Sequence, residues 1–196
     1  ASDARRITMR ILGLDPGLNH TGWGILDCRQ NRFERIESGV INVPQGALSV
    51  RLGHIVRELR GIIGRTQPEI VSVEKVFVNM NPQSTLRLSQ ARAAALIAAD
   101  LSGLQVLEYT PSEIKLAVTG TGSADKVMVQ KMVLMLLKLD ERLYPDEADA
   151  LACAICGANR MVMQAYENQG ATARTYATAR HGRSAQGARR AWTQAL

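Results

Sequence analysis

The chain of 196 residues has few cysteines and no long apolar run, and each of these shortages excludes a class of protein. Three cysteines, an odd number without framework spacing, argue against a secreted protein held together by disulfides. No apolar stretch approaches the ~20 residues that span a bilayer, so we expect no membrane span. The first residues, ASDARRITMR, lack the apolar segment of a signal peptide, and the cytoplasm is the expected location.

The positive charge of the chain is unevenly distributed. The net charge is +6, and residues 161–196 hold five arginines but only one glutamate. A basic balance favours a polyanionic partner such as nucleic acid. Because residues 1–160 are nearly neutral, a nucleic-acid surface there depends on the local placement of Lys and Arg.

The hydrophobic pattern predicts one α/β domain over residues 10–163, between a leader over residues 1–9 and a basic tail over residues 164–196. We expect a five-stranded mixed sheet, with three antiparallel strands followed by parallel crossovers, flanked by helices. Cys153 and Cys156 lie in an Ala-rich helical pattern without a second pair, and we interpret them as buried small hydrophobes. The predicted strands cover residues 9–15, 21–28, 33–43, 69–74 and 105–109, and the predicted helices cover 49–66, 84–103, 111–118, 125–138 and 146–163.

Four carboxylates stand in informative local settings. Asp15 ends the apolar run RILGLD, Glu74 ends EIVSVE, and Asp146 and Asp149 open the helical pattern DEADALACAIC. Carboxylates at the ends of buried strands are costly without cationic partners. If folding brings the four together, a divalent metal is the simplest explanation, because Mg²⁺ and Mn²⁺ prefer oxygen ligands. That arrangement indicates phosphoryl-transfer chemistry with two metal ions.

Each carboxylate alone also has a structural interpretation. Asp15 before Pro-Gly can cap a turn, and Glu74 can be a solvated strand end. Asp146 can be a helix N-cap, with Asp149 as a favourable first-turn charge. Spacing of three places these two aspartates about 60° apart on one helical face, where like charges repel unless a cation lies between them. Glu147 lies about 100° around the helix and is not included in the site.

Five segments together resemble one nuclease family: LGLDPGLNHTGWGIL, SVEKVFVNMN, TLRLSQARAAA, the GTGSADK loop and DEADALACAI. In this order and spacing they resemble the RuvC-type Holliday junction resolvases, which belong to the ribonuclease H-like nucleases. The resemblance covers about residues 8–160. The DPG hairpin alone is less specific, because actin-like and sugar-kinase ATPases use a similar one.

The resemblance implies a Mg²⁺-dependent endonuclease that cuts four-way DNA junctions in recombination and repair, leaving 5′ phosphates. Two Mg²⁺ ions, for which Mn²⁺ is a plausible substitute, would be bound by Asp15, Glu74, Asp146 and Asp149. The family also implies a homodimer and a branch-migration motor as a partner. Residues 85–101 are the expected dimer surface, with packing on the chain's own sheet as the alternative.

Five further residues are candidates for binding DNA. Phe77 can stack on an unpaired base or pack in the core, and Asn79 belongs to a polar link that can reach a junction. Arg87 can meet a phosphate or remain a solvated charge. Lys115 and Lys126 flank the glycine loop, and Lys126, which opens a helix, is the stronger phosphate ligand and a catalytic candidate. The competing functions are an actin-like or sugar-kinase ATPase domain and a non-catalytic junction-binding protein.

Overall fold

The strands and helices follow the predicted order along the chain. The computed structural model describes residues 8–29, 32–75 and 82–164. The elements are β1 (Thr8–Asp15), β2 (His20–Arg29), β3 (Arg32–Asn42), α1 (Leu48–Thr66), β4 (Ile70–Glu74), α2 (Pro82–Asp100), β5 (Gln105–Tyr109), α3 (Pro111–Thr119) and α4 (Lys126–Leu137). A further helix covers residues 145–164. The sheet and its covering helices belong to a unit that ends at Asn159, and Arg160 begins a second unit.

One mixed sheet contains all five of these strands in the order β3-β2-β1-β4-β5. β2 pairs antiparallel with both β1 and β3, whereas β4 pairs parallel with both β1 and β5. Parallel neighbours need a crossover connection, which α2 supplies between β4 and β5. The predicted sheet, three antiparallel strands followed by parallel crossovers, is confirmed.

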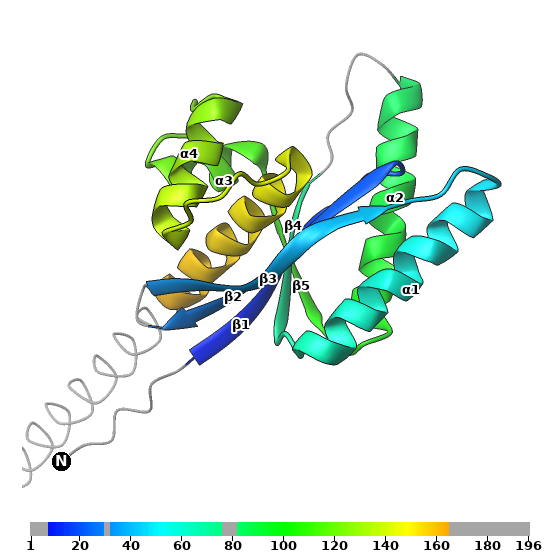
Figure 1. Ribbon diagram of the computed structural model, residues 1–196, viewed down its shortest axis with the longest axis horizontal. Coiled ribbons are helices and arrows are strands. Elements are labelled where there is room, and N and C mark those ends of the chain that lie inside the picture. The colour runs from blue at the N-terminus through cyan, green and yellow to red at the C-terminus, as the bar shows by residue number, and fades with distance from the viewer. Residues whose placement is uncertain (1–7, 30–31, 76–81, 165–196) are drawn as a thin grey trace, which may run out of the picture. The chain divides into compact units, whose positions relative to one another are not determined.

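Helices cover both faces of this sheet (Figure 1), with α1 and α2 on one face and α3, α4 and the helix over residues 145–159 on the other. Leu12 and Leu14 of β1 belong to the apolar core shared with α1 and α2. Because side chains alternate along a strand, Gly13 and Asp15 face the opposite side. The same alternation in β4 sends Val71 and Val73 into the core, and it turns residues 72 and 74 toward the second face.

The helix that begins at residue 145 lies directly against this second face. A Cβ atom on Gly13 would lie 2.0 Å from the main-chain oxygen of Ala150, so only glycine permits this approach. On the neighbouring strand, Ser72 Oγ donates a 2.6 Å hydrogen bond to the main-chain oxygen of Cys153. Cys153 and Cys156 are both buried and form no disulfide, which confirms their interpretation as core residues.

The alanines of α2 face the chain's own core. Ala91, Ala94, Ala95 and Ala98 are each at most 3% exposed and contribute to the cluster shared with α1 and the sheet. The expectation that these small side chains form a dimer surface is therefore wrong, because they pack within the same chain. α2 as a dimer surface remains a prediction, but only for its other face.

Element boundaries agree with the predicted ones to within three residues, and those of β5 match at both ends. The helix predicted over residues 84–103 ends at Asp100, because Gly103 adopts a left-handed φ of 70° and Leu104 N–H bonds back to the carbonyl of Ala99. β1 begins at Thr8, inside the predicted leader, because Thr8 already pairs with Arg29. Within the described part of the chain, no helix combines the length and apolar character needed to cross a bilayer.

Candidate active site

Asp15 and Glu74 end two adjacent strands at one edge of the sheet. β1 and β4 are parallel neighbours, so their carboxyl ends meet at the same edge. Both side chains alternate onto the face that residues 145–159 of the last helix cover. The structure therefore places the two predicted strand-end carboxylates beside each other and toward that helix.

Asp146 lies in the first turn of the helix, and Asp149 begins the second turn. The helix begins at Pro145, the position where proline is most favourable, and Ala148 N–H bonds to the main-chain oxygen of Tyr144 at 2.9 Å. Tyr144 is therefore the N-cap residue. The alternative that Asp146 serves as the N-cap is excluded, because Asp146 is already inside the turn.

Close backbone packing sets the start of this helix beside Asp15. Gly22 of β2 is the partner of Asp15 in the antiparallel pair. A Cβ atom on Gly22 would lie 1.9 Å from the main-chain oxygen of Asp146. Glycine at position 22 therefore allows the first turn to rest on the strand pair that carries Asp15.

The four carboxylates influence one another electrostatically. The pKa of Asp15 is raised from 3.8 to about 7, first by burial and then by the negative charges of Asp149, Asp146 and Glu74. Burial, followed by the charge of Asp149, also raises the pKa of Glu74. The charge of Lys126 opposes both shifts. Burial and neighbouring negative charge thus disfavour the ionised forms of Asp15 and Glu74, and the charges that do so come from the other predicted carboxylates.

Two lysines supply positive charge beside the cluster. Lys126 Nζ donates a 2.6 Å hydrogen bond to Asp149 Oδ2, and this bond is the main cause of the raised pKa of Lys126. Asp125 caps α4 by accepting a hydrogen bond from Met128 N–H at 2.8 Å, which makes Lys126 the first residue of the helix. Lys115 of α3 lies nearby, and its positive charge opposes the rise in the pKa of Glu74.

A cleft of about 210 Å³ opens between these elements. Its polar side chains come from strand β4, from helices α3 and α4, and from the beginning of the helix that starts at residue 145. Its apolar side chains come from α3, α4 and that last helix. The lining residues are Glu74, Pro111, Ile114, Lys115, Lys126, Val129, Asp149 and Ala152.

The chemistry of the cluster suits a divalent cation, although its side chains are not arranged around one. Clustered carboxylate oxygens are the ligands that Mg²⁺ and Mn²⁺ prefer, and the raised pKa values of Asp15 and Glu74 reflect burial together with neighbouring negative charge. Among residues 8–29, 32–75 and 82–164, no three His, Cys, Asp or Glu side chains form a ready metal site. One physical reason is that the Lys126 ammonium is bonded to Asp149. Metal binding therefore requires side-chain rearrangement.

The remaining DNA-binding candidates fare differently. Phe77 and Asn79 lie outside the described residues. Arg87 is exposed on α2 and does not line the cleft. A contact that the sequence did not reveal comes from Arg92, whose Nε donates to the main-chain oxygen of Glu74 at 3.1 Å and so holds the end of β4.

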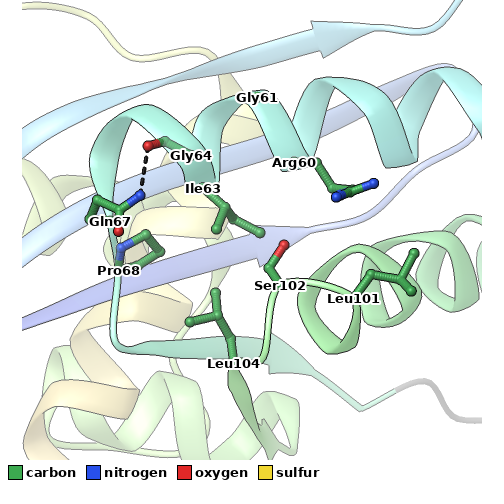
Figure 2. Close-up of a pocket in the computed structure, with 9 residues that line it drawn as sticks. All are labelled: Arg60, Gly61, Ile63, Gly64, Gln67, Pro68, Leu101, Ser102 and Leu104. Atoms are coloured by element: carbon green, nitrogen blue, oxygen red, sulfur yellow. Dashed lines mark hydrogen bonds between the residues drawn. The ribbon is translucent and has the colours of Figure 1, made fainter.

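A second cleft, of about 450 Å³, lies where α1 ends and α2 meets β5 (Figure 2). Gln67 and Pro68 line it just before β4 begins, whereas Glu74 ends that strand. None of its nine lining residues is acidic, and Arg60 supplies the charge. This cleft therefore lacks the groups for the chemistry of the carboxylate cluster.

The fold and the carboxylate cluster together define the class. A mixed sheet of this strand order, with acidic residues at the ends of its central strands and on a covering helix, is the architecture of the ribonuclease H-like nucleases. Structural similarity extends to a yeast mitochondrial Holliday junction resolvase, with a TM-score of 0.59, 13% identity and coverage of 78% of this chain and 79% of that one. At that identity the likeness concerns the fold alone.

Sequence comparison identifies the family. The family described as crossover junction endodeoxyribonuclease RuvC matches residues 11–157. The chain is 51% identical over 152 residues to the RuvC of Nitrosomonas eutropha, which covers 78% of this chain and 85% of the relative. It is 52% identical over 152 residues to the RuvC of Bordetella pertussis, covering 77% and 84%. The chain belongs to the RuvC family.

A solved structure supports the same assignment. The chain resembles Thermus thermophilus RuvC in complex with a Holliday junction substrate, with a TM-score of 0.75, 31% identity and coverage of 80% of this chain and 96% of that one. Nucleases of this family are metal-dependent. These matches support neither the ATPase alternative nor the non-catalytic junction-binding alternative.

Proposed function

We propose that this protein resolves four-way DNA junctions by paired, symmetric nicks in homologous recombination and DNA repair. The observation that carries the proposal is the convergence of Asp15, Glu74 and the first turn of the helix over residues 145–164 at one edge of the sheet. The names of the relatives, and the junction bound by the Thermus thermophilus protein, support the choice of substrate. We expect it to act in the cytoplasm.

Four carboxylates are proposed to bind two divalent ions, Mg²⁺ with Mn²⁺ as a substitute. Asp15, Glu74, Asp146 and Asp149 would hold these ions, with Asp15 shared between them. The ions would supply Lewis acidity for in-line attack of water on phosphorus and for the departing 3′ oxygen, and the products would be a 5′ phosphate and a 3′ hydroxyl.

Lys126 is proposed to serve catalysis through its position. Its ammonium group is bonded to Asp149, and it leaves that carboxylate when cations occupy the cluster. It can then bond a non-bridging oxygen of the scissile phosphate, on which negative charge increases in the transition state. Lys115, which lines the same cleft, is proposed to bind a neighbouring phosphate and fix the register of the DNA strand.

Three further residues are proposed to bind the junction outside the cleft. Arg87, exposed on α2, would contact a backbone phosphate. Phe77 and Asn79 follow the strand that ends at Glu74, which places them in the chain directly after a proposed metal ligand. Phe77 would stack on an unpaired base near the crossover, and Asn79 would contact the junction.

The proposed dimer uses the exposed face of α2. Leu86, Ile97 and Leu101 are 62%, 52% and 58% exposed, and their spacing places them on one side of the helix and its end. A second copy of this chain would cover that apolar face. A two-fold dimer would supply two active sites related by the same symmetry as the two junction strands that are cut. A branch-migration motor is the proposed further partner.

A substitution on this face tests the dimer. Ile97→Glu places a charge at the proposed interface and is expected to yield a monomer in analytical ultracentrifugation. On a junction in supercoiled plasmid, the monomer should nick one strand without the paired second cut. If the variant remains a dimer that cuts in pairs, the α2 face is not the interface.

A cleavage assay tests the proposed activity. Labelled four-way junction, duplex and single strand are incubated with the protein in Mg²⁺ or in EDTA, and the nicks are mapped. The expected result is Mg²⁺-dependent nicking of the junction alone, at symmetric positions on strands of like polarity. Asp140→Asn, a change of an exposed carboxylate after α4, is the matched control and should cut normally. Junction binding without cutting would support a silent binding protein instead.

A further inference from the structure

Glu147 lies between two proposed metal ligands in the sequence but points elsewhere. The residue is 7% exposed, one of the few buried acidic residues that the structure describes. A buried carboxylate is expensive to desolvate, so its partners must satisfy it. They are supplied by the cap of its own helix and by strand β3.

The first partner closes the start of the helix. Tyr144 N–H donates a 3.2 Å hydrogen bond to Glu147 Oε2. Because Tyr144 is the N-cap and Glu147 is the third helical residue, this bond is one half of a capping box. This bond stabilises the first turn of the helix, which contains Asp146 and directly precedes Asp149.

The second partner joins that turn to the sheet. Ser38 Oγ donates a 2.7 Å hydrogen bond to Glu147 Oε1. Arg35 contacts both partners: its Nη1 donates a 3.3 Å hydrogen bond to Ser38 Oγ and lies 3.9 Å from Glu147 Oε1. Its other amino group pairs with Glu141. Glu147 is thus held by a hydroxyl and a guanidinium from β3.

This tether acts at the place where the helix crosses the sheet. Ser38 pairs with Gly24 across β3 and β2, and Gly22, two residues earlier on β2, lies under the main-chain oxygen of Asp146. Glu147 therefore fixes the turn from the side of β3, while the glycine contact fixes its height above the strand that pairs with Asp15.

We propose that Glu147, anchored by Ser38, is a positioning residue that sets the orientation of Asp146 and Asp149 toward Asp15 and Glu74. The inference rests on the proposed metal-dependent function of the same cluster. Groups that orient metal ligands typically change metal affinity or activity by about 10–100-fold when they are removed. Glu147 itself touches neither ion nor DNA.

Titration calorimetry with Mn²⁺ tests the proposal in the full-length protein. Glu147→Ala and Ser38→Ala are expected to weaken Mn²⁺ binding by about 10-fold or more. The double variant should lose no more than Glu147→Ala alone, because the two residues act through one contact. Glu147→Gln, which keeps an oxygen for Ser38, should recover part of the affinity. The matched control is Glu141→Ala, which removes the other partner of Arg35 and should bind Mn²⁺ normally.

Junction cleavage supplies the second readout. The two tether variants should have lower kcat at subsaturating Mn²⁺, partly restored by excess Mn²⁺, with unchanged junction affinity in EDTA. Ser38→Ala carries the test if Glu147→Ala does not fold. Wild-type Mn²⁺ affinity in the folded variants, whatever their thermal stability, would overturn the proposal, as would an equal loss in Glu141→Ala. If the wild-type protein binds Mn²⁺ but cuts no junction, the proposed function fails, while the affinities still decide the role of Glu147.

Discussion

Replacing Asp15 by Asn should stabilise the metal-free protein at alkaline pH while abolishing its activity. An unfolded aspartate is ionised above about pH 4, whereas the folded protein retains the proton of Asp15 up to a pKa of about 7. Between these values the folded state binds the extra proton, so the free energy of unfolding decreases as the pH rises from about 4 to 7. Asn cannot ionise and does not contribute this decrease.

The size of the effect follows from the shift. Raising the pKa from 3.8 to about 7, at about 1.4 kcal/mol per pKa unit, gives an upper limit of about 4 kcal/mol at pH 8. Residual exposure of Asp15 lowers the effect below that limit. Such a cost is typical of active sites, where function opposes stability.

Urea unfolding in EDTA at pH 4.5, 6 and 8 measures this effect. Asp15→Asn should differ least from the wild-type protein at pH 4.5 and exceed it most in free energy of unfolding at pH 8. Asp100→Asn, an exposed control, should show no pH-dependent difference. In parallel, Asp15→Asn should bind the junction without cutting it. If the stability difference is independent of pH, or if Asp15→Asn is the less stable protein at pH 8, the electrostatic argument is refuted.

Three further substitutions or deletions test other parts of the account. Gly22→Ala should destabilise the fold by about 1–3 kcal/mol and reduce cleavage by about 100-fold through displacement of Asp146. Gly61→Ala, which has open space around its Cβ, should do neither. Equal behaviour of the two variants in denaturant and cleavage assays would contradict the role of Gly22. Phe77→Ala should impair cleavage more than duplex binding, and equal losses would assign Phe77 to the core. Deleting residues 164–196 should weaken junction binding and lower its salt dependence by up to about 0.9 in log–log slope per lost phosphate contact; an unchanged slope would make the tail incidental.

Much of the site could be predicted because it depends on local signals. Asp15 and Glu74 each end a short apolar run, and a helical crossover between the runs implies parallel strands with their carboxyl ends at one edge. The Asp146–Asp149 spacing implies one helical face. Strand pairing and helix periodicity are sufficient to bring these carboxylates together without tertiary detail.

The parts that sequence could not supply depend on which surfaces meet. The alanines of α2 suit either a partner chain or the chain's own core, and packing against α1 selects the core. The sequence gives Gly22 no special role, because its need for glycine arises only from the helix that packs against it at Asp146. The ion pair of Lys126 with Asp149 joins two successive helices through residues that are 23 positions apart, and helix periodicity alone does not predict how those helices pack.

Glu147 is an intermediate case. Helical geometry turns it away from the two aspartates, as predicted. Pro at the first helical position followed by Glu at the third is nevertheless a recognisable start signal, and that signal could have revealed the capping bond to Tyr144. The contact with Ser38 on β3 could not be inferred from sequence, because it requires the helix to be placed on the sheet.

The most direct test of the central claim is a crystal structure of the protein with Mn²⁺ and a junction that carries an uncleavable phosphorothioate at the cut. An anomalous difference map locates the ions independently of the protein atoms. We expect two peaks about 3.5–4 Å apart, with Asp15 contacting both and Glu74, Asp146 and Asp149 completing the ligands beside the scissile phosphate. Peaks located elsewhere, or a scissile phosphate bound with no ion among these four carboxylates, would contradict the central claim.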